Sequence, residues 1–138
     1  MKGLSASLLL VATLVVTGCS SMQSMETASR GNTSSSASDW SGYDESGQAT
    51  FYADKYVGRK TASGEVYQHG LKTAAHKRLP FGSRVKVTNT QNNKSVVVKV
   101  NDRGSFGGGR IIDLSKSAFS SIANPAVGVI PVEIEVLE

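Results

Sequence analysis

The chain has 138 residues, 39% of them hydrophobic, a single cysteine and a formal net charge of +4. This length suits one small domain behind a targeting segment, and one cysteine excludes an intrachain disulfide, so packing alone must hold the fold. Residues 47–138 carry 13 Lys and Arg against 7 Asp and Glu, whereas residues 20–46 carry one Arg and four acidic residues. A basic domain behind an acidic segment favours an anionic partner: nucleic acid, phospholipid headgroups or a carboxylate-bearing polysaccharide.

The first 18 residues have the pattern of a targeting segment, with the cation Lys2 before an apolar core that is too short to span a bilayer as a permanent helix. The core ends in Val16-Thr17-Gly18-Cys19, which resembles a bacterial lipobox. We therefore expect a lipoprotein signal peptide over residues 1–18 and lipidation of Cys19, whose acyl chains would hold the protein at a membrane. Ser20 in place of Asp resembles the outer-membrane sorting pattern, so we expect an outer-membrane anchor facing the periplasm. An ordinary secretory signal with a chance cysteine is the alternative.

Residues 19–46 are rich in Ser, Thr, Ala, Gly and Asn and show no apolar periodicity. Such a segment cannot bury enough surface to offset its ordering entropy, so it is predicted to be a flexible tether. Trp40 and Tyr43 are its two aromatic exceptions, and the folded domain is expected over residues 47–138.

The domain sequence predicts mostly short strands. Weak alternation over 48–53 indicates a first strand, and the 72–76 segment is either one helical turn or a strand end. Val85 and Val87 alternate with polar residues in a half-buried strand, and the turn at 90–94 leads into the valine run 96–100. The length of this run predicts a strand buried on both faces.

The C-terminal part adds two strands and a helix. The segment 111–114 is apolar, and Ser115 is a candidate N-cap for a short helix that ends by Ala123. Residues 129–137 alternate, with Val132, Ile134 and Val136 predicted to face inward. Five to six short strands with one short helix predict a small closed or nearly closed β-barrel, because closure buries strand edges.

Asp102 stands out because it lies on the turn Asn101-Asp102-Arg103-Gly104, directly after the valine strand. A rigid strand end is a suitable place to present a polar group to a ligand. The alternative is an ordinary turn, in which the carboxylate bonds to nearby backbone N–H groups.

Several sequence blocks, in this order, resemble the rare lipoprotein A family across nearly all of residues 47–138: Thr61-Ala62-Ser63-Gly64-Glu65, Thr73-Ala74-Ala75-His76, Leu79-Pro80-Phe81-Gly82, Asn101-Asp102-Arg103-Gly104 and Arg110-Ile111-Ile112-Asp113-Leu114-Ser115. The resemblance implies a mainly β fold, a six-stranded double-psi β-barrel with one or two short helices. It also implies a peptidoglycan lytic transglycosylase, a carbon–oxygen lyase that prefers glycan strands lacking stem peptides. Relatives commonly carry a C-terminal SPOR domain, and we expect none here.

Lytic transglycosylation needs one carboxylic acid that protonates the glycosidic oxygen and then accepts the proton of the muramoyl C6 hydroxyl. Asp102 is the first candidate for this acid, and Glu65 is the second carboxylate, either as the acid itself or as a like-charged neighbour of Asp102. His76 completes the catalytic candidates by orienting a carboxylate or binding substrate. Arg103, Tyr52 and Thr61 are the substrate-binding candidates. 

Asp113 is expected to cap the following helix or to pair with Arg110. We expect no metal and no cofactor, because His69, His76, Asp102 and Asp113 lack the spacing of a zinc site. The glycine run 107–109 does not match a phosphate-binding loop.

Nucleic acid is not expected as the partner of an exported lipoprotein, and the basic charge fits the carboxylates of peptidoglycan. Two other functions remain open: a non-catalytic peptidoglycan-binding or structural lipoprotein, and a glycosidase that uses Asp102 and Glu65 with water.

Overall fold

The computed structural model describes residues 39–104 and 106–138. The predicted signal peptide, the lipidation site Cys19 and most of the predicted tether lie outside the described residues. The described chain forms these elements in order: β1 (Asp44–Phe51), a 3-10 turn (Asp54–Tyr56), β2 (Thr73–His76), β3 (Arg84–Asn89), β4 (Ser95–Asp102), β5 (Arg110–Leu114), α1 (Lys116–Ile122), a second 3-10 turn (Pro125–Val127) and β6 (Ile130–Val136).

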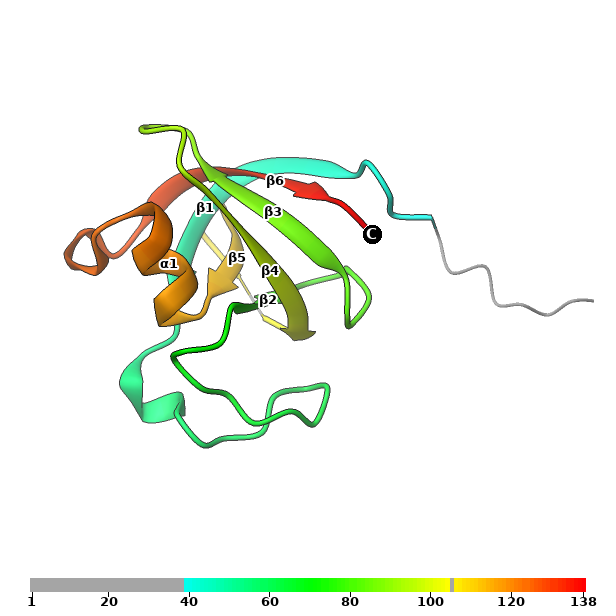
Figure 1. Cartoon of the computed structure of the whole chain (residues 1–138), viewed down its shortest axis with the longest axis vertical. Coiled ribbons are helices and arrows are strands. Elements are labelled where there is room, and N and C mark those ends of the chain that lie inside the picture. The colour runs from blue at the N-terminus through cyan, green and yellow to red at the C-terminus, as the bar shows by residue number, and fades with distance from the viewer. Residues whose placement is uncertain (1–38, 105) are drawn as a thin grey trace, which may run out of the picture. The chain divides into compact units, whose positions relative to one another are not determined.

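The six strands close into one barrel in the order β1-β5-β2-β4-β3-β6 (Figure 1). Two neighbouring pairs, β1 with β5 and β2 with β4, run parallel, and the other four pairs are antiparallel. Closure pairs both sides of every strand, which removes the exposed edges of an open sheet. The predicted mainly β, six-stranded barrel with one short helix is therefore confirmed. In the described part of the chain, no helix has the length and apolar character needed to span a membrane.

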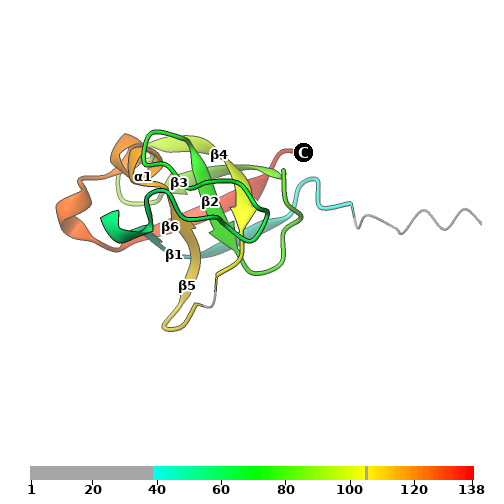
Figure 2. The ribbon, with the colours of Figure 1, turned by 90° about the horizontal axis from the view of Figure 1, so that it is seen from below.

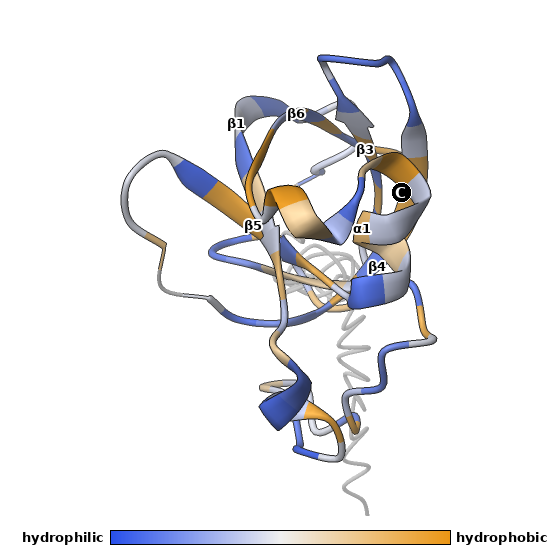
Figure 3. Ribbon diagram, turned by 90° about the vertical axis from the view of Figure 1, so that its left-hand side faces the viewer, coloured by the Kyte–Doolittle hydropathy of each residue, from blue (hydrophilic) through white to orange (hydrophobic). Residues whose placement is uncertain are grey.

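The barrel core is built from the alternating residues that the sequence indicates. Ile130, Val132, Ile134 and Val136 of β6 are buried, whereas the glutamates between them are exposed. The helix α1 packs its buried residues, which include Phe119, into the same core. Figure 3 shows hydrophobic colour on α1 and along the strands, and mostly hydrophilic colour in the loops.

Strand β4 corrects one prediction. Val96, Val98 and Val100 are buried, but Val97 and Lys99 point outward and are exposed. The strand is thus buried on one face only, because the other face of a barrel wall meets solvent. The valine at the outward position 97 hides the period of two that would have indicated this.

Strand β1 begins four residues earlier than the predicted strand. Asp44 to Gly47 pair with β6 in antiparallel register, and Trp40 and Tyr43 pack against the core. Cross-strand pairing with β6 orders residues whose local composition indicates a tether.

Three local predictions hold in the structure. Ser115 caps α1, with its hydroxyl oxygen accepting a bond from the Ala118 N–H at 3.3 Å. The predicted turn at 90–94 joins β3 to β4, and Asn93 takes a positive φ of 59° there. The ambiguous segment at 72–76 contains the strand β2, whose four residues are all buried between β4 and β5.

Gly47 provides a test of the packing between β1 and β5. A Cβ atom at this position would lie 2.6 Å from Ile111 Cγ2 and 2.8 Å from the carbonyl oxygen of Gly109. We expect Gly47→Ala to lower the free energy of unfolding by about 1–3 kcal/mol, as overpacking does. Gly70→Ala is the matched control, because a Cβ at Gly70 meets nothing within 4 Å. Equal denaturant midpoints for the two variants would contradict this account.

Candidate active site

Two carboxylates lie on the strands on either side of β2. Ala75 has two cross-strand Cα partners, Asp102 on β4 and Asp113 on β5. Neighbouring strands lie about 4.8 Å apart, so the two aspartate Cα atoms are roughly 10 Å apart across β2. Figure 2 shows β4, β2 and β5 side by side in this order.

Both aspartates line a pocket of about 620 Å³. The pocket lies between the end of β1, the loop after it and the facing ends of β4 and β5. Its lining includes Thr50, Tyr52, Ala75, Asp102, Arg103 and Asp113. A concave site with convergent polar groups is the default place to look for binding or catalysis.

Three donors hold the carboxylate of Asp102. Its Oδ1 accepts bonds from the backbone N–H groups of Ala62 and Arg103, both at 2.8 Å. Its Oδ2 accepts a bond from the hydroxyl of Tyr52 at 2.6 Å. The two backbone bonds are those of an ordinary turn. The half-buried side chain of Asp102 also lines the pocket. Donors to both oxygens fix the orientation of the carboxylate.

Tyr52 joins the pocket to the aromatic residues behind it. Its ring lies 4.5 Å from the ring of Tyr67 and 5.8 Å from that of Tyr56, measured between centroids. Burial, the bond to Asp102 and the nearby negative charges raise the pKa of Tyr52 far above its usual value. The hydroxyl therefore remains protonated and donates to Asp102. Tyr52, a predicted substrate-binding residue, is among the residues that line this pocket.

Asp113 corrects another prediction, because it does not cap α1. The cap is Ser115, and the carboxylate of Asp113 accepts a bond from the hydroxyl of Thr50 on β1. Arg110 also lines the pocket, yet within residues 39–104 and 106–138 it forms no ion pair with Asp113 shorter than 4 Å. Sequence proximity to the helix suggested a cap, whereas strand register turns the side chain to the pocket.

Glu65 lies outside the lining of the pocket, in the loop between β1 and β2. Its carboxylate accepts bonds from Lys99 Nζ at 2.7 Å and from Asn101 Nδ2 at 2.9 Å. These two bonds lower the pKa of the exposed Glu65 carboxyl. Glu65 thus ties its loop to the outer face of β4, next to Asp102.

Thr61 lies in the same loop and bonds to its backbone. Its N–H and its hydroxyl both donate to the carbonyl oxygen of Glu65, at 2.7 and 3.1 Å. The next residue, Ala62, supplies a backbone donor to Asp102. Thr61 and Glu65 therefore position a loop that orients Asp102, and neither of them lines the pocket.

His76 is buried, with 1% of its surface exposed. Its Nδ1 accepts bonds from the N–H groups of Arg78 and Leu79, both at 3.2 Å, and its Nε2 lies 3.3 Å from Glu45 Oε2. Burial lowers the pKa of His76, more than the nearby Glu45 raises it. The imidazole organises the turn after β2, and it is not among the residues that line the pocket.

Arg103 lines the pocket but directs its guanidinium elsewhere. Its Nη1 donates to the carbonyl oxygen of His76 at 3.2 Å, and the guanidinium carbon lies 4.1 Å from the centroid of the Phe81 ring. The cation is thus engaged with groups other than the Asp102 carboxylate. The pocket carries further basic side chains, so its lining has five cations: Lys55, Arg59, Lys60, Arg103 and Arg110.

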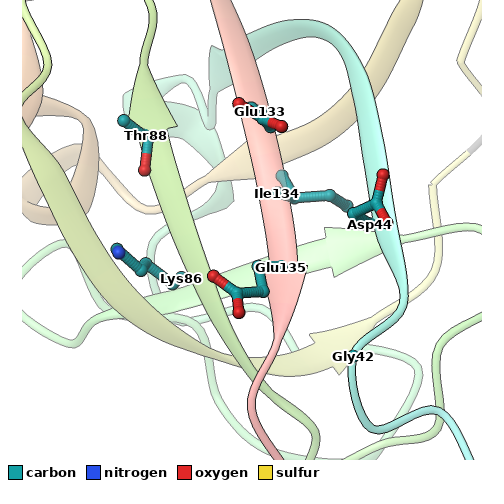
Figure 4. A pocket seen from close by; sticks show the side chains of 7 residues that line it. All are labelled: Gly42, Asp44, Lys86, Thr88, Glu133, Ile134 and Glu135. Carbon is teal, nitrogen blue, oxygen red and sulfur yellow. The ribbon is translucent and has the colours of Figure 1, made fainter.

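A second pocket crosses the outer face of β3, β6 and β1 (Figure 4). Asp44 and Glu135 are directly opposed there, and Lys86 opposes Glu135 on its other side. This is a cross-strand ladder of charges, in which the lysine offsets two like-charged neighbours. No group of three metal-ligating side chains occurs in residues 39–104 and 106–138.

The burial of His76 has a consequence for stability. Its folded pKa lies below the usual value of 6.5, so the unfolded chain binds a proton first as the pH falls. We expect this contribution of His76 to the free energy of unfolding to be complete above pH 6.5. As the pH falls from 6.5 to the folded pKa, the free energy of unfolding should decrease by at most about 1.4 kcal/mol per pH unit. Denaturant unfolding between pH 7.5 and pH 4.5 measures this slope.

The slope should be shallower in His76→Asn, whose amide oxygen can replace Nδ1 as the acceptor. His69→Gln removes the other histidine of the chain and serves as the control. An unchanged slope in His76→Asn would assign the effect to other groups.

Comparison with known proteins gives the family. A family model described as lytic transglycolase matches residues 44–134. The chain is 51% identical over 98 residues to the endolytic peptidoglycan transglycosylase RlpA of Pasteurella multocida, covering 71% of this chain and 33% of that protein. It is 53% identical over 96 residues to the RlpA of Vibrio cholerae, covering 70% of this chain and 36% of that protein. The chain therefore spans about a third of the length of these relatives.

The solved structures support the fold. A mutant expansin of Clavibacter michiganensis, in complex with cellohexaose, superposes with a TM-score of 0.54 at 19% identity, over 69% of this chain and 50% of that chain. The closed six-stranded barrel, the match over residues 44–134 and the level of identity to two RlpA proteins show that this chain belongs to the RlpA-like lytic transglycosylases with a double-psi β-barrel.

Proposed function

We propose that this protein is an exported, lipid-anchored lytic transglycosylase that cleaves the bond between N-acetylmuramic acid and N-acetylglucosamine in peptidoglycan. The observation that carries the proposal is Asp102. Its carboxylate is held at a basic pocket by one tyrosine hydroxyl and two backbone N–H groups, in a chain of this family.

The reaction requires two proton transfers. A carboxylic acid protonates the glycosidic oxygen while the bond from that oxygen to the muramoyl C1 breaks, and the bonding electrons leave with the oxygen. The muramoyl C6 hydroxyl then attacks C1, and a carboxylate takes its proton. The products are a free N-acetylglucosamine hydroxyl and a 1,6-anhydromuramoyl end. Asp102 is proposed to take part directly in these transfers, since pre-positioned carboxyl groups perform such steps.

The five basic residues of the pocket support an anionic substrate. A glycan strand without stem peptides presents a free lactyl carboxylate on every muramic acid, and strands of this kind are the proposed preference. Cations around a concave site concentrate such a ligand. The remaining predicted site residues are assigned positioning roles: Glu65, Thr61 and His76 hold the segments that shape the pocket.

One observation favours a second function. All three donors to the Asp102 carboxylate are groups of the protein itself, as in a purely structural turn. A non-catalytic peptidoglycan-binding lipoprotein would have such a carboxylate without any need to move a proton.

Incubation of the purified mature protein, in detergent, with stem-peptide-free glycan strands decides between these functions. Mass spectrometry of the fragments should find anhydromuramoyl ends. We expect Asp102→Asn to lower the cleavage rate by about 10²–10⁴-fold with the fold retained. Glu133→Gln is the control, because Glu133 is an exposed carboxylate that lines the second pocket, on the outer face of β6.

The other outcomes are equally specific. Reducing muramoyl ends would mean that water is the nucleophile and that the protein is a glycosidase. Intact glycan that co-sediments with the protein would identify a binding module. Cleavage by Asp102→Asn at the wild-type rate would remove Asp102 from the chemistry.

The membrane anchor is tested at Cys19. We expect Cys19→Ser to move the protein from the membrane fraction to the soluble periplasmic fraction, because each buried acyl CH₂ contributes about 0.8 kcal/mol of membrane affinity. Ser20→Asp is the matched variant, which should keep the lipid and move the protein from the outer to the inner membrane. Retention of Cys19→Ser in the outer membrane would exclude lipidation as the anchor.

A further inference from the structure

The pocket of Asp102 holds a second carboxylate that is not Glu65. Asp113 on β5 lines the same pocket and is half-buried. It sits across β2 from Asp102, because Ala75 is the cross-strand partner of both. The two side chains come from the strands on either side of β2, so the pairing of β2 with β4 and β5 sets their spacing.

The two carboxylates reach one pocket from strands on either side of β2. Their Cα atoms lie roughly 10 Å apart, two strand spacings across the sheet, and both residues line the pocket. Glycosidases likewise use two carboxyl groups that flank the scissile bond. In a transglycosylase the nucleophile is the C6 hydroxyl of the substrate in place of water.

The two carboxylates have different surroundings. Asp102 accepts three bonds, two of them from backbone N–H groups. In the described residues, Asp113 has one donor, the Thr50 hydroxyl, which is able to rotate and to accept as readily as it donates. The oxygens of Asp102 already accept three bonds, whereas the hydroxyl beside Asp113 can also accept a bond from a carboxylic acid. Asp102 is therefore placed to act as a base, and Asp113 is placed to act as an acid.

Tyr52 shows that the two groups share one electrostatic environment. Its hydroxyl bonds to Asp102, and the negative charges of both Asp102 and Asp113 contribute to raising its pKa.

We propose that Asp113 is the general acid of the reaction and that Asp102 is its base. This inference rests on the proposed function and divides between two residues the two transfers that one carboxyl was expected to perform. Asp113 gives its proton to the glycosidic oxygen as the C1–oxygen bond breaks. Asp102 takes the proton of the C6 hydroxyl as the bond from that oxygen to C1 forms. The proton gained by Asp102 then passes to Asp113 through solvent, which restores the starting state.

The test compares two substrates of the mature protein in detergent. One is the stem-peptide-free glycan strand. The other is a muramoyl glycoside with a nitrophenyl leaving group, which departs without being protonated. An acid variant is rescued by such a leaving group, and a base variant is not. 

We expect Asp113→Asn to cleave glycan about 10²–10⁴-fold more slowly than the wild type and to recover to within about tenfold of it on the nitrophenyl substrate. Asp102→Asn should be slow on both substrates. Glu133→Gln should be unchanged on both.

A second measurement uses a variant that keeps the carboxyl group. Thr50→Val removes the hydroxyl that bonds to Asp113 and preserves side-chain shape. We expect Thr50→Val to slow the cleavage of glycan more than the cleavage of the nitrophenyl substrate, because the acid that Thr50 positions is needed only for the glycan leaving group. If Asp113→Asn does not fold, this difference decides the question, and equal effects on both substrates overturn the proposal.

The failures are distinguishable. Wild-type rates in Asp113→Asn, or equal losses on both substrates, would remove Asp113 as the acid while leaving the transglycosylase function intact. Absence of cleavage by the wild type on glycan and on the nitrophenyl substrate would reject the proposed function, and the roles of both aspartates with it.

Discussion

The pairing of β2 with β4 on one side and β5 on the other is the constraint on which the site depends. The strand is only four residues long and all four are buried, so its neighbours determine where it lies. Its partners run in different senses: β4 is parallel to β2 and β5 is antiparallel. A register shift between Ala74 and Ala75 in the β2–β4 ladder brings the last residue of β4 opposite Ala75, which is also the partner of the fourth residue of β5. A carboxylate from each strand consequently faces one pocket.

The loop between β1 and β2 completes the surroundings of Asp102. It carries the backbone donor at Ala62, and its register on β4 is fixed by the Ser63 N–H, which donates to the carbonyl oxygen of Asn101 at 3.2 Å. The ion pair of Glu65 with Lys99 lies on the exposed outer face of β4, where solvent screens it. The ion pair therefore holds geometry more than it adds stability.

The buried His76 helps to position Arg103 beside the Asp102 turn. His76 and its acceptor bonds shape the turn that precedes Phe81, and Phe81 supplies the ring beneath the Arg103 guanidinium. Arg103 is thereby placed at the pocket without neutralising Asp102. A cleft that contains both cations and carboxylates can attract an anionic polysaccharide and still retain proton-transfer groups.

The sequence alone determined the fold class, the alternation of β3 and β6, the cap at Ser115 and the identity of Asp102 as the residue to examine. These features depend on local periodicity, on short-range side-chain bonds and on blocks of residues shared with a known family. The first strand was predicted too short because its beginning is ordered by β6, which lies some 90 residues away along the chain. The outward valine in β4 concealed its one-sided burial for a similar reason, since only the closed barrel defines which face is inside.

Only the tertiary structure decided which carboxylates meet. Glu65 stands in a sequence block of the family, yet it faces Lys99 and Asn101 outside the pocket. Asp113, which local sequence placed at a helix cap, faces the pocket because β5 pairs with β1 and β2. The register of strands that are distant in the sequence sets the direction of a side chain, and that register is a property of the closed barrel rather than of any one segment.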